Sequence, residues 1–112
     1  MKKRIFDHYE IDSEGYIINL KTNQKMLGNK NTHNPYVKIN LTVDGEKKTF
    51  LMHKLLIMAF VDKYDERVHK IRFRDGDLSN CRLENLELTT IKWLGYHKIL
   101  YVEPIIIIDS QK

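Results

Sequence analysis

Residues 36–43 alternate strictly between polar and apolar side chains, and Asp44 and Gly45 follow them directly. A period of two is typical of a half-buried strand. The Asp-Gly pair favours a type I′ hairpin, because both central residues of that turn adopt positive φ. The sequence therefore predicts an antiparallel hairpin whose return strand covers about residues 47–51.

Weaker periodicities place the other elements. Strands are expected at about residues 9–11, 16–20, 25–27, 68–73 and 86–89. A helix is expected at about residues 53–60, because apolar residues recur there at the spacing of an amphipathic helix. A second helix is expected at about residues 91–100, weakened by Gly95, and four isoleucines after Pro104 indicate the beginning of a strand.

The composition limits the class of protein. A chain of 112 residues is expected to form one small domain, and its apolar runs are far shorter than a membrane-spanning helix. The single cysteine, Cys81, excludes an intramolecular disulfide and a cysteine-rich zinc site. No apolar core follows the basic start, so we expect no secretory signal and a cytoplasmic location. The net charge of +4 is compatible with nucleic acid as a partner but does not demonstrate it, since a solvated, mildly basic surface is the simpler explanation.

Residues 71–90 carry the most informative motif. They read IRFRDGDLSNCRLENLELTT and resemble the ββα-metal core of the HNH homing endonucleases. The matching positions are Asp75, Gly76, Asp77, Asn80, Leu83, Glu84, Asn85, Leu86 and Thr89. Residues 50–60 resemble the helix that precedes this core, and residues 9–17 resemble a hairpin of the family's N-terminal module. The three segments follow the family's order, so the resemblance covers about residues 9–90.

The resemblance implies an α+β fold with N-terminal antiparallel β hairpins, followed by a short helix and a ββα-metal (HNH) core. We therefore expect an N-terminal sheet module at 1–51, an HNH-like core at 52–100 and a strand-like tail at 101–112, all within one compact unit. The tail is similar to the opening strand of the small helix-turn-helix modules that often follow such nucleases. A buried or edge strand explains it equally well.

The family's chemistry uses a histidine as general base and a divalent cation, held by a residue beside that histidine and by another on the last helix. The register set by Asp75 and Gly76 places Phe73 at the histidine position and Arg72 at the neighbouring ligand position. Phenylalanine does not titrate, and arginine offers only hydrogen-bond donors. We therefore expect no metal ligand and no cofactor, and Mg²⁺ or Mn²⁺ only if a nuclease activity survives.

Other residues of the implied site are kept or displaced. Asn85 occupies the position that orients the histidine or the loop. The ligand position on the last helix falls near Leu94, and a shift of helix register offers His97 instead. Among the other histidines, His69 lies roughly 13 Å along the strand from the histidine position, and His53 is expected to have a structural role.

Basic residues form two candidate DNA-binding groups. The first group, in the HNH-like core, could bind a DNA phosphate. The second group could contact DNA from the N-terminal strands, as the resemblance to the family implies. The candidates are Arg72, Arg74, Arg82 and Lys92 around the core, and Lys38, Lys47 and Lys48 on the hairpin. In both groups, solvated side chains without a ligand are the simpler alternative.

The sequence thus predicts a nucleic-acid-binding protein on an HNH homing-endonuclease scaffold, of phage or mobile-element origin, that binds double-stranded DNA and does not cut it. Two alternatives stay open: a divergent metal-dependent DNA nickase or endonuclease, and a phage protein that binds and inhibits a host or competitor protein. In the second alternative, isoleucines Ile105 to Ile108 could pair with a partner's sheet or with a second copy. No association with a membrane is expected.

Overall fold

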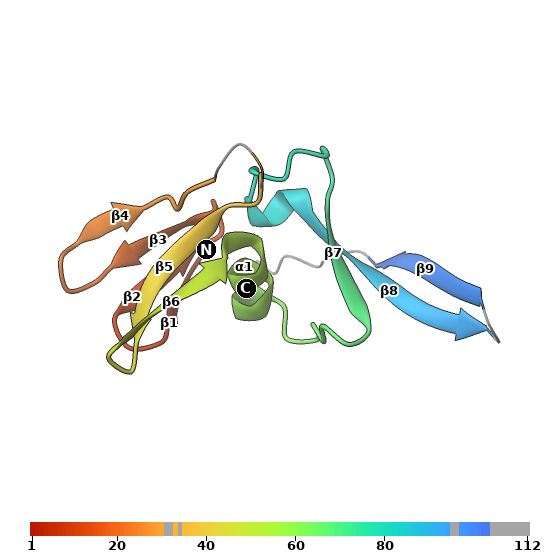
Figure 1. The fold of residues 1–112 in the computed structure, drawn as a ribbon, viewed down its shortest axis with the longest axis horizontal. Coiled ribbons are helices and arrows are strands. Elements are labelled where there is room, and N and C mark those ends of the chain that lie inside the picture. The colour runs from red at the N-terminus through yellow and green to blue at the C-terminus, as the bar shows by residue number, and fades with distance from the viewer. Residues whose placement is uncertain (31–32, 34, 95–96, 104–112) are drawn as a thin grey trace.

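Three antiparallel sheets and one α-helix make up the described part of the chain (Figure 1). The computed structural model describes residues 1–30, 33, 35–94 and 97–103, with side chains only as far as Ile91. The elements are β1 (Lys2–Ile5), β2 (Tyr9–Asp12), β3 (Tyr16–Asn19), β4 (Gln24–Met26), β5 (Lys38–Val43), β6 (Glu46–Leu51), α1 (Met52–Phe60), β7 (His69–Phe73), the 3₁₀ turn Leu83–Asn85, β8 (Leu86–Leu94) and β9 (His97–Glu103). The sheets are β1-β2-β3-β4, β5-β6 and β7-β8-β9. The predicted α+β class is confirmed.

The hairpin β5–β6 matches its prediction closely. Asp44 and Gly45 have φ angles of 53° and 80°, as a type I′ turn requires. The register pairs Lys38 with Leu51 and Thr42 with Lys47. Because side chains opposite one another share a face of the sheet, the two lysines lie on one outer face of the hairpin.

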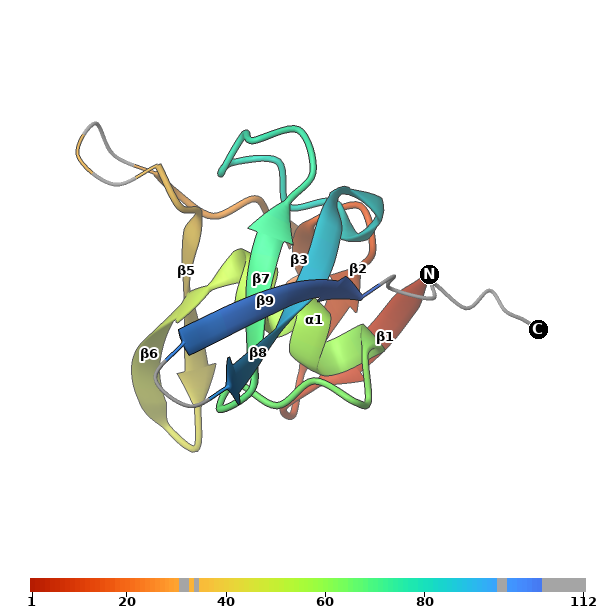
Figure 2. The ribbon, with the colours of Figure 1, turned by 90° about the vertical axis from the view of Figure 1, so that its right-hand side faces the viewer.

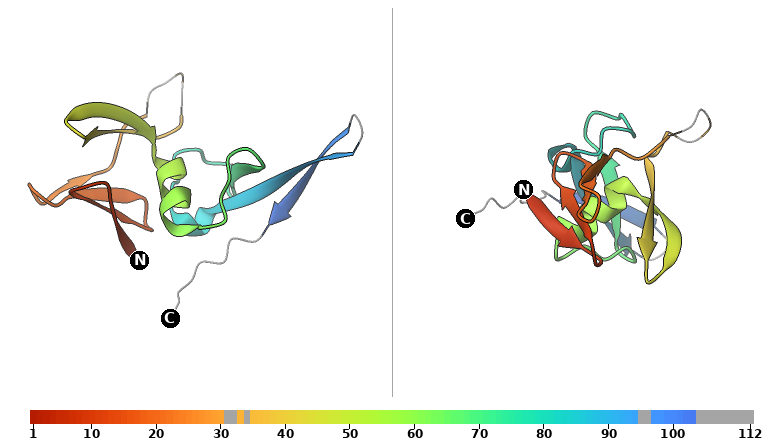
Figure 3. Two further views of the ribbon diagram at one scale, coloured as in Figure 1. Left: turned by 90° about the horizontal axis from the view of Figure 1, so that it is seen from below. Right: turned by 90° about the vertical axis from the view of Figure 1, so that its left-hand side faces the viewer.

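Helix α1 lies between the N-terminal sheets and β7–β8 (Figures 1 and 3), and five of its residues belong to the hydrophobic core. Met52, Leu56 and Ile57 of this helix are fully buried. Seen from the β9 side, β7 and β8 lie in front of α1 (Figure 2). The fully buried sheet residues of the same hydrophobic core include Ile11, Ile17, Leu41, Leu86 and Leu88. The helix thus shares one hydrophobic core with residues of all three sheets. Among the described residues, no helix is long and apolar enough to cross a membrane.

The turn between β2 and β3 is fastened to the segment that precedes β8. Gly15 has a φ of +98°, and a Cβ at this position would lie 3.1 Å from the carbonyl carbon and oxygen of Cys81. The backbone N–H of Leu83 donates to the carbonyl of Ser13 at 2.8 Å. Glycine fits both the conformation and the close approach. The N-terminal sheet and the segment leading into β8 are thus in direct backbone contact.

Two elements differ from their predictions. Strand β1 was not expected, because three of its four residues are charged and exposed and show no alternation; it pairs with β2 at the edge of the first sheet. The predicted helix at residues 91–100 is wrong: β8 continues to Leu94 and pairs with β9 over seven positions. Isoleucine and tryptophan in this segment favour a strand, and a short apolar run does not separate the two structures by periodicity alone. The predicted strand after Pro104 lies outside the described residues.

The long hairpin β8–β9 projects beyond β7 (Figures 1 and 3). Strand β7 pairs with β8 only between Leu86 and Thr90, so the far part of β8 has β9 as its sheet neighbour. This hairpin occupies the place in the sequence where the resemblance implies the last helix of the core.

Candidate functional site

Asn85 organises the loop that joins β7 to β8. Its side-chain Nδ2 donates to the Oδ1 of Asp75 and to the carbonyl oxygen of Asn80, both at 3.0 Å. Its Oδ1 accepts from the backbone N–H of Asp75 at 3.1 Å, and its carbonyl accepts from the N–H of Arg74 at 2.7 Å. Asn85 is buried, with 8% of its surface exposed. One side chain thus ties the beginning of the loop to its middle and to its end.

The two carboxylates of this loop accept hydrogen bonds from the loop itself. The amide of Asn80 lowers the pKa of Asp75 most, followed by the backbone N–H of Asp77. The hydroxyl and the backbone N–H of Ser79 lower the pKa of Asp77 in the same way. The negative charges therefore stabilise the shape of the loop.

Phe73 is packed into an aromatic cluster, which we define as Tyr36, His53 and Phe73. The Phe73 ring meets the His53 ring edge to face, with centroids 5.0 Å apart, and only 8% of Phe73 is exposed. Tyr36 stacks on His53 at 5.3 Å. Burial, and secondarily the charge of Lys54, lowers the pKa of His53 from 6.5 to about 4. The imidazole is therefore neutral at pH 7, and its buried Nδ1 has no hydrogen-bond partner among the described residues.

Arg72 and Arg74 lie on either side of one carboxylate. The Nε of Arg72 is 3.5 Å from one oxygen of Glu87, and the Nε of Arg74 is 3.6 Å from the other. Arg72 and Glu87 are also paired across β7 and β8. About half of each arginine side chain is exposed, so the two cations and the carboxylate present a net positive charge to solvent.

The other predicted DNA contacts are dispersed. Arg82 forms ion pairs with Glu14 at 2.7 Å and with Glu84 at 3.2 Å, far along the chain from the hairpin lysines. Lys38 and Lys47 share the outer face of β5–β6, whereas Lys48 is paired with the buried Leu41 and belongs to the other face. Lys92 lies on β8 and His97 begins β9, and their side chains are outside the described part of the structure. His97 is thus at the start of a strand and not on a helix.

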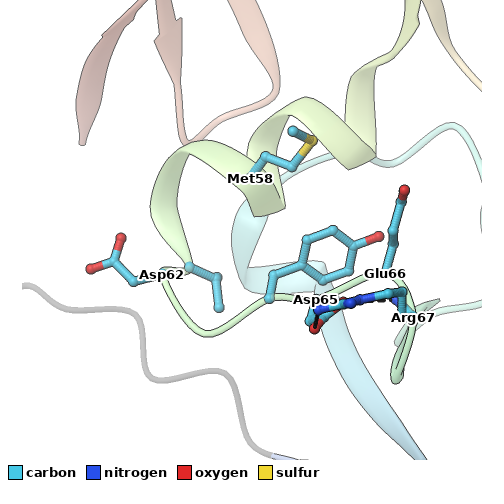
Figure 4. A pocket seen from close by; sticks show the side chains of 7 residues that line it. Met58, Asp62, Asp65, Glu66 and Arg67 are labelled. Atoms are coloured by element: carbon cyan, nitrogen blue, oxygen red, sulfur yellow. Dashed lines mark hydrogen bonds and ion pairs between the residues drawn. The ribbon is translucent and has the colours of Figure 1, made fainter.

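Two open hollows flank the segment 64–67. The first, of about 560 Å³, is lined by Met58 of α1 and by acidic residues that include Asp62 and Asp65 (Figure 4). The second, of about 600 Å³, lies between the start of α1 and β7; we call it the β7 groove. It is lined by Tyr36, Leu51, His53, Lys54, Tyr64, Glu66, Arg67, His69, Lys70 and Ile71. Sequence reasoning did not identify either hollow, because each combines segments that are separate in the sequence.

The side chains at the implied metal position do not form a ligand set. Across residues 1–30, 33 and 35–91, no three His, Cys, Asp or Glu side chains are grouped so that they could hold a metal ion. The guanidinium of Arg72 offers only donors, and the carboxylate of Asp75 already accepts hydrogen bonds from Asp77, Asn80 and Asn85. These residues therefore do not fit a divalent cation.

The chain is similar to known endonucleases over most of its length, although no family model matches it. Two uncharacterized HNH endonucleases of Acanthamoeba polyphaga mimivirus are each 30% identical to it over 95 residues, which are 85% and 83% of this chain. The DNA endonuclease I-HmuI of Bacillus phage SP01 is 29% identical over 85 residues, or 76% of this chain. A solved structure concerning DNA binding and cleavage by the HNH homing endonuclease I-HmuI matches 74% of this chain with a TM-score of 0.65 and 26% identity.

The relatives are longer than this chain. The matched region is 28% and 23% of the two mimivirus proteins and 48% of the phage enzyme, and 47% of the chain in the solved structure. The similarity therefore concerns one part of each relative.

Proposed function

Because this chain is a homologue of the HNH homing endonucleases and shares their fold, we propose that it binds duplex DNA without hydrolysing it. A DNA endonuclease among its relatives supports DNA as the partner. Relatives from a phage and a giant virus support an origin in a phage or another mobile element.

The aromatic cluster at the histidine position carries the proposal that hydrolysis is lost. A general base must be within hydrogen-bond reach of a water and must accept its proton. Phe73 has no such group, and its ring is enclosed against His53. His53 itself is a poor base, because its pKa is lowered to about 4 and its Nδ1 is buried.

The neighbouring residues support the same proposal. Arg72 takes the place of a metal ligand and pairs with Glu87, so positive charge at this point comes from the protein itself. The hairpin β8–β9 follows where the family's last helix would supply a further ligand.

Two surfaces are the proposed contacts with the DNA backbone. On the first, Lys38 and Lys47 share the outer face of β5–β6, and no ion pair among the described residues involves either lysine. On the second, Arg72 and Arg74 are about half exposed. Lysine and arginine contacts to phosphates fix the position of a protein on a duplex and make its affinity depend on salt.

The test is a binding and cleavage experiment with the full chain. Supercoiled plasmid and a short duplex are incubated with protein in Mg²⁺, Mn²⁺ or EDTA, at several salt concentrations. We expect a mobility shift that weakens with salt and no nicking in any condition. The double variant Lys38→Gln, Lys47→Gln should reduce the slope of log affinity against log salt by about two, at roughly 0.9 per phosphate contact. The matched control is Lys3→Gln, Lys21→Gln, which removes the same charge from exposed positions of the first sheet and its turn.

Three results would contradict the proposal. Metal-dependent nicking that follows the protein through purification would restore the nuclease alternative. Equal effects of the two double variants would show that net charge, and not the face of β5–β6, accounts for the binding. The absence of any shift at low salt would reject DNA binding and favour a protein partner.

A further inference from the structure

We propose that the β7 groove binds one unstacked nucleotide of a single DNA strand. This inference rests on the proposed function and adds a second mode of binding, at a different surface from the outer face of β5–β6. The groove has a volume of about 600 Å³, which lies within the usual range for small-molecule sites in proteins.

Aromatic rings from four separate segments line this groove. Tyr36 stacks on His53 with ring planes 30° apart, and Tyr64 stacks on His69 with ring planes 24° apart. Each tyrosine is thus backed by a second ring that fixes its position. Nucleobases stack on aromatic side chains when the bases are not already stacked in a helix. Bases within a duplex stack on one another, so only a single strand or an extruded nucleotide can use such a site.

The charges of the groove suit a phosphate. Its lining carries three cationic side chains and the carboxylate of Glu66. Glu66 pairs with Lys54 at 2.7 Å, and Arg67 pairs with Asp65 at 2.9 Å. No ion pair among the described residues involves Lys70, so its ammonium group is the cation that a bound phosphate would meet. The first hollow shares Glu66 and Arg67 with this groove, but it adds the carboxylates of Asp62 and Asp65 and has no lysine, so its lining is net negative.

His53 contributes a neutral polar group to the same surface. It lines the groove while its Nδ1 is buried, so Nε2 is the ring nitrogen that a ligand can reach. An uncharged imidazole can hydrogen-bond to the edge of a base without repelling the cations around it. Stacking rings, an unpaired cation and a neutral hydrogen-bonding group thus meet within one groove, as nucleotide recognition requires.

The test uses a single-stranded oligonucleotide of mixed sequence with one 2-aminopurine, and the matching duplex. Stacking of the 2-aminopurine on a tyrosine should quench its fluorescence when the full chain binds. We expect Tyr36→Leu to weaken single-strand binding about 5- to 150-fold, the range that corresponds to loss of one base–aromatic contact. Tyr36→Phe keeps the ring and should bind as the unaltered chain does. Tyr16→Leu, on β3 in the first sheet, is the matched control and should have no effect.

A second variant tests the phosphate contact. Lys70→Gln should reduce the salt slope of single-strand binding by about 0.7, whereas Lys21→Gln should not. All variants are compared with the unaltered chain by thermal unfolding, and Tyr36→Phe separates loss of the ring from a general disturbance of the fold.

The outcomes for the two proposals are distinguishable. The groove is overturned as a nucleotide site if the single strand does not bind, or if it binds Tyr36→Leu as well as it binds the unaltered chain. If duplex binding persists in that case, the proposed function stays intact. Absence of binding to both nucleic acids rejects both proposals. Single-strand binding that Tyr36→Leu weakens, with duplex binding unchanged, supports the groove.

Discussion

Replacing Asn85 by alanine should destabilise the protein by disconnecting the β7–β8 loop. The side chain makes three hydrogen bonds, two with Asp75 and one with the carbonyl of Asn80, at 3.0–3.1 Å. Each such bond contributes about 1 kcal/mol net. Because Asp75 is exposed, we count its carboxylate as an ordinary acceptor, and the expected loss is about 3 kcal/mol.

Urea denaturation followed by fluorescence measures this loss. With a slope of about 1.5 kcal/mol per molar urea, the midpoint should fall by about 2 M. The matched control is Asn40→Ala: Asn40 is exposed on β5 and accepts one hydrogen bond from Thr49, so its replacement should cost within about 0.5 kcal/mol. If the two alanine variants had equal midpoints, the loop would not depend on the buried amide and the reasoning would be wrong.

The isosteric variant Asn85→Asp separates hydrogen bonding from loss of volume. It places a carboxylate oxygen where Nδ2 now donates to the carboxylate of Asp75. At pH 7 the two like charges should make this variant at least as unstable as Asn85→Ala. Near pH 4 one carboxyl keeps its proton and can donate to the other, so the difference from the unaltered chain should narrow.

Two further predictions concern charge. The pKa of His53 is lowered to about 4 in the folded protein, so between about pH 6.5 and 4 this histidine is protonated mainly in the unfolded chain. The free energy of unfolding should therefore fall by roughly 2–3 kcal/mol as the pH drops over that range. The accompanying drop in urea midpoint should be smaller in His53→Gln. Glu87→Gln removes the carboxylate shared by Arg72 and Arg74, so duplex affinity in gel shifts should rise and the salt slope should steepen by about one. Unchanged affinity would exclude these arginines from the DNA contact.

Local patterns predicted the elements whose structure is decided by nearby residues. The β5–β6 hairpin follows from strict alternation and a turn with two positive φ angles, and α1 follows from its apolar spacing. The prediction of a helix at residues 91–100 was wrong. The apolar residues of this segment allow a helix and a strand equally, and the pairing of β8 with β9 decides in favour of the strand. Strand β1 forms because it pairs with β2, and its own charged residues carry no pattern that predicts a strand.

The site was predictable as a set of positions but not as a set of contacts. The motif located Asn85 and placed Phe73 at the position of the family's histidine. It gave no sign that Tyr36 and His53, from a loop and a helix, would close around that phenyl ring. Glu87 was not predicted as a site residue either, because its role is to pair with two arginines that the sheet register brings beside it.

The backbone contact at Gly15 has a consequence for how two DNA contacts would act together. The β2–β3 turn is held against Cys81 and Leu83, and α1 packs between the sheets, so the N-terminal sheets are joined to β7 and β8 at more than one point. In the proposed function, the span of duplex between the lysines of β5–β6 and the arginines of β7 would then be set by the fold. The protein would sense the local twist of the DNA between these two points, because over- or underwound duplex would move one set of phosphates out of reach.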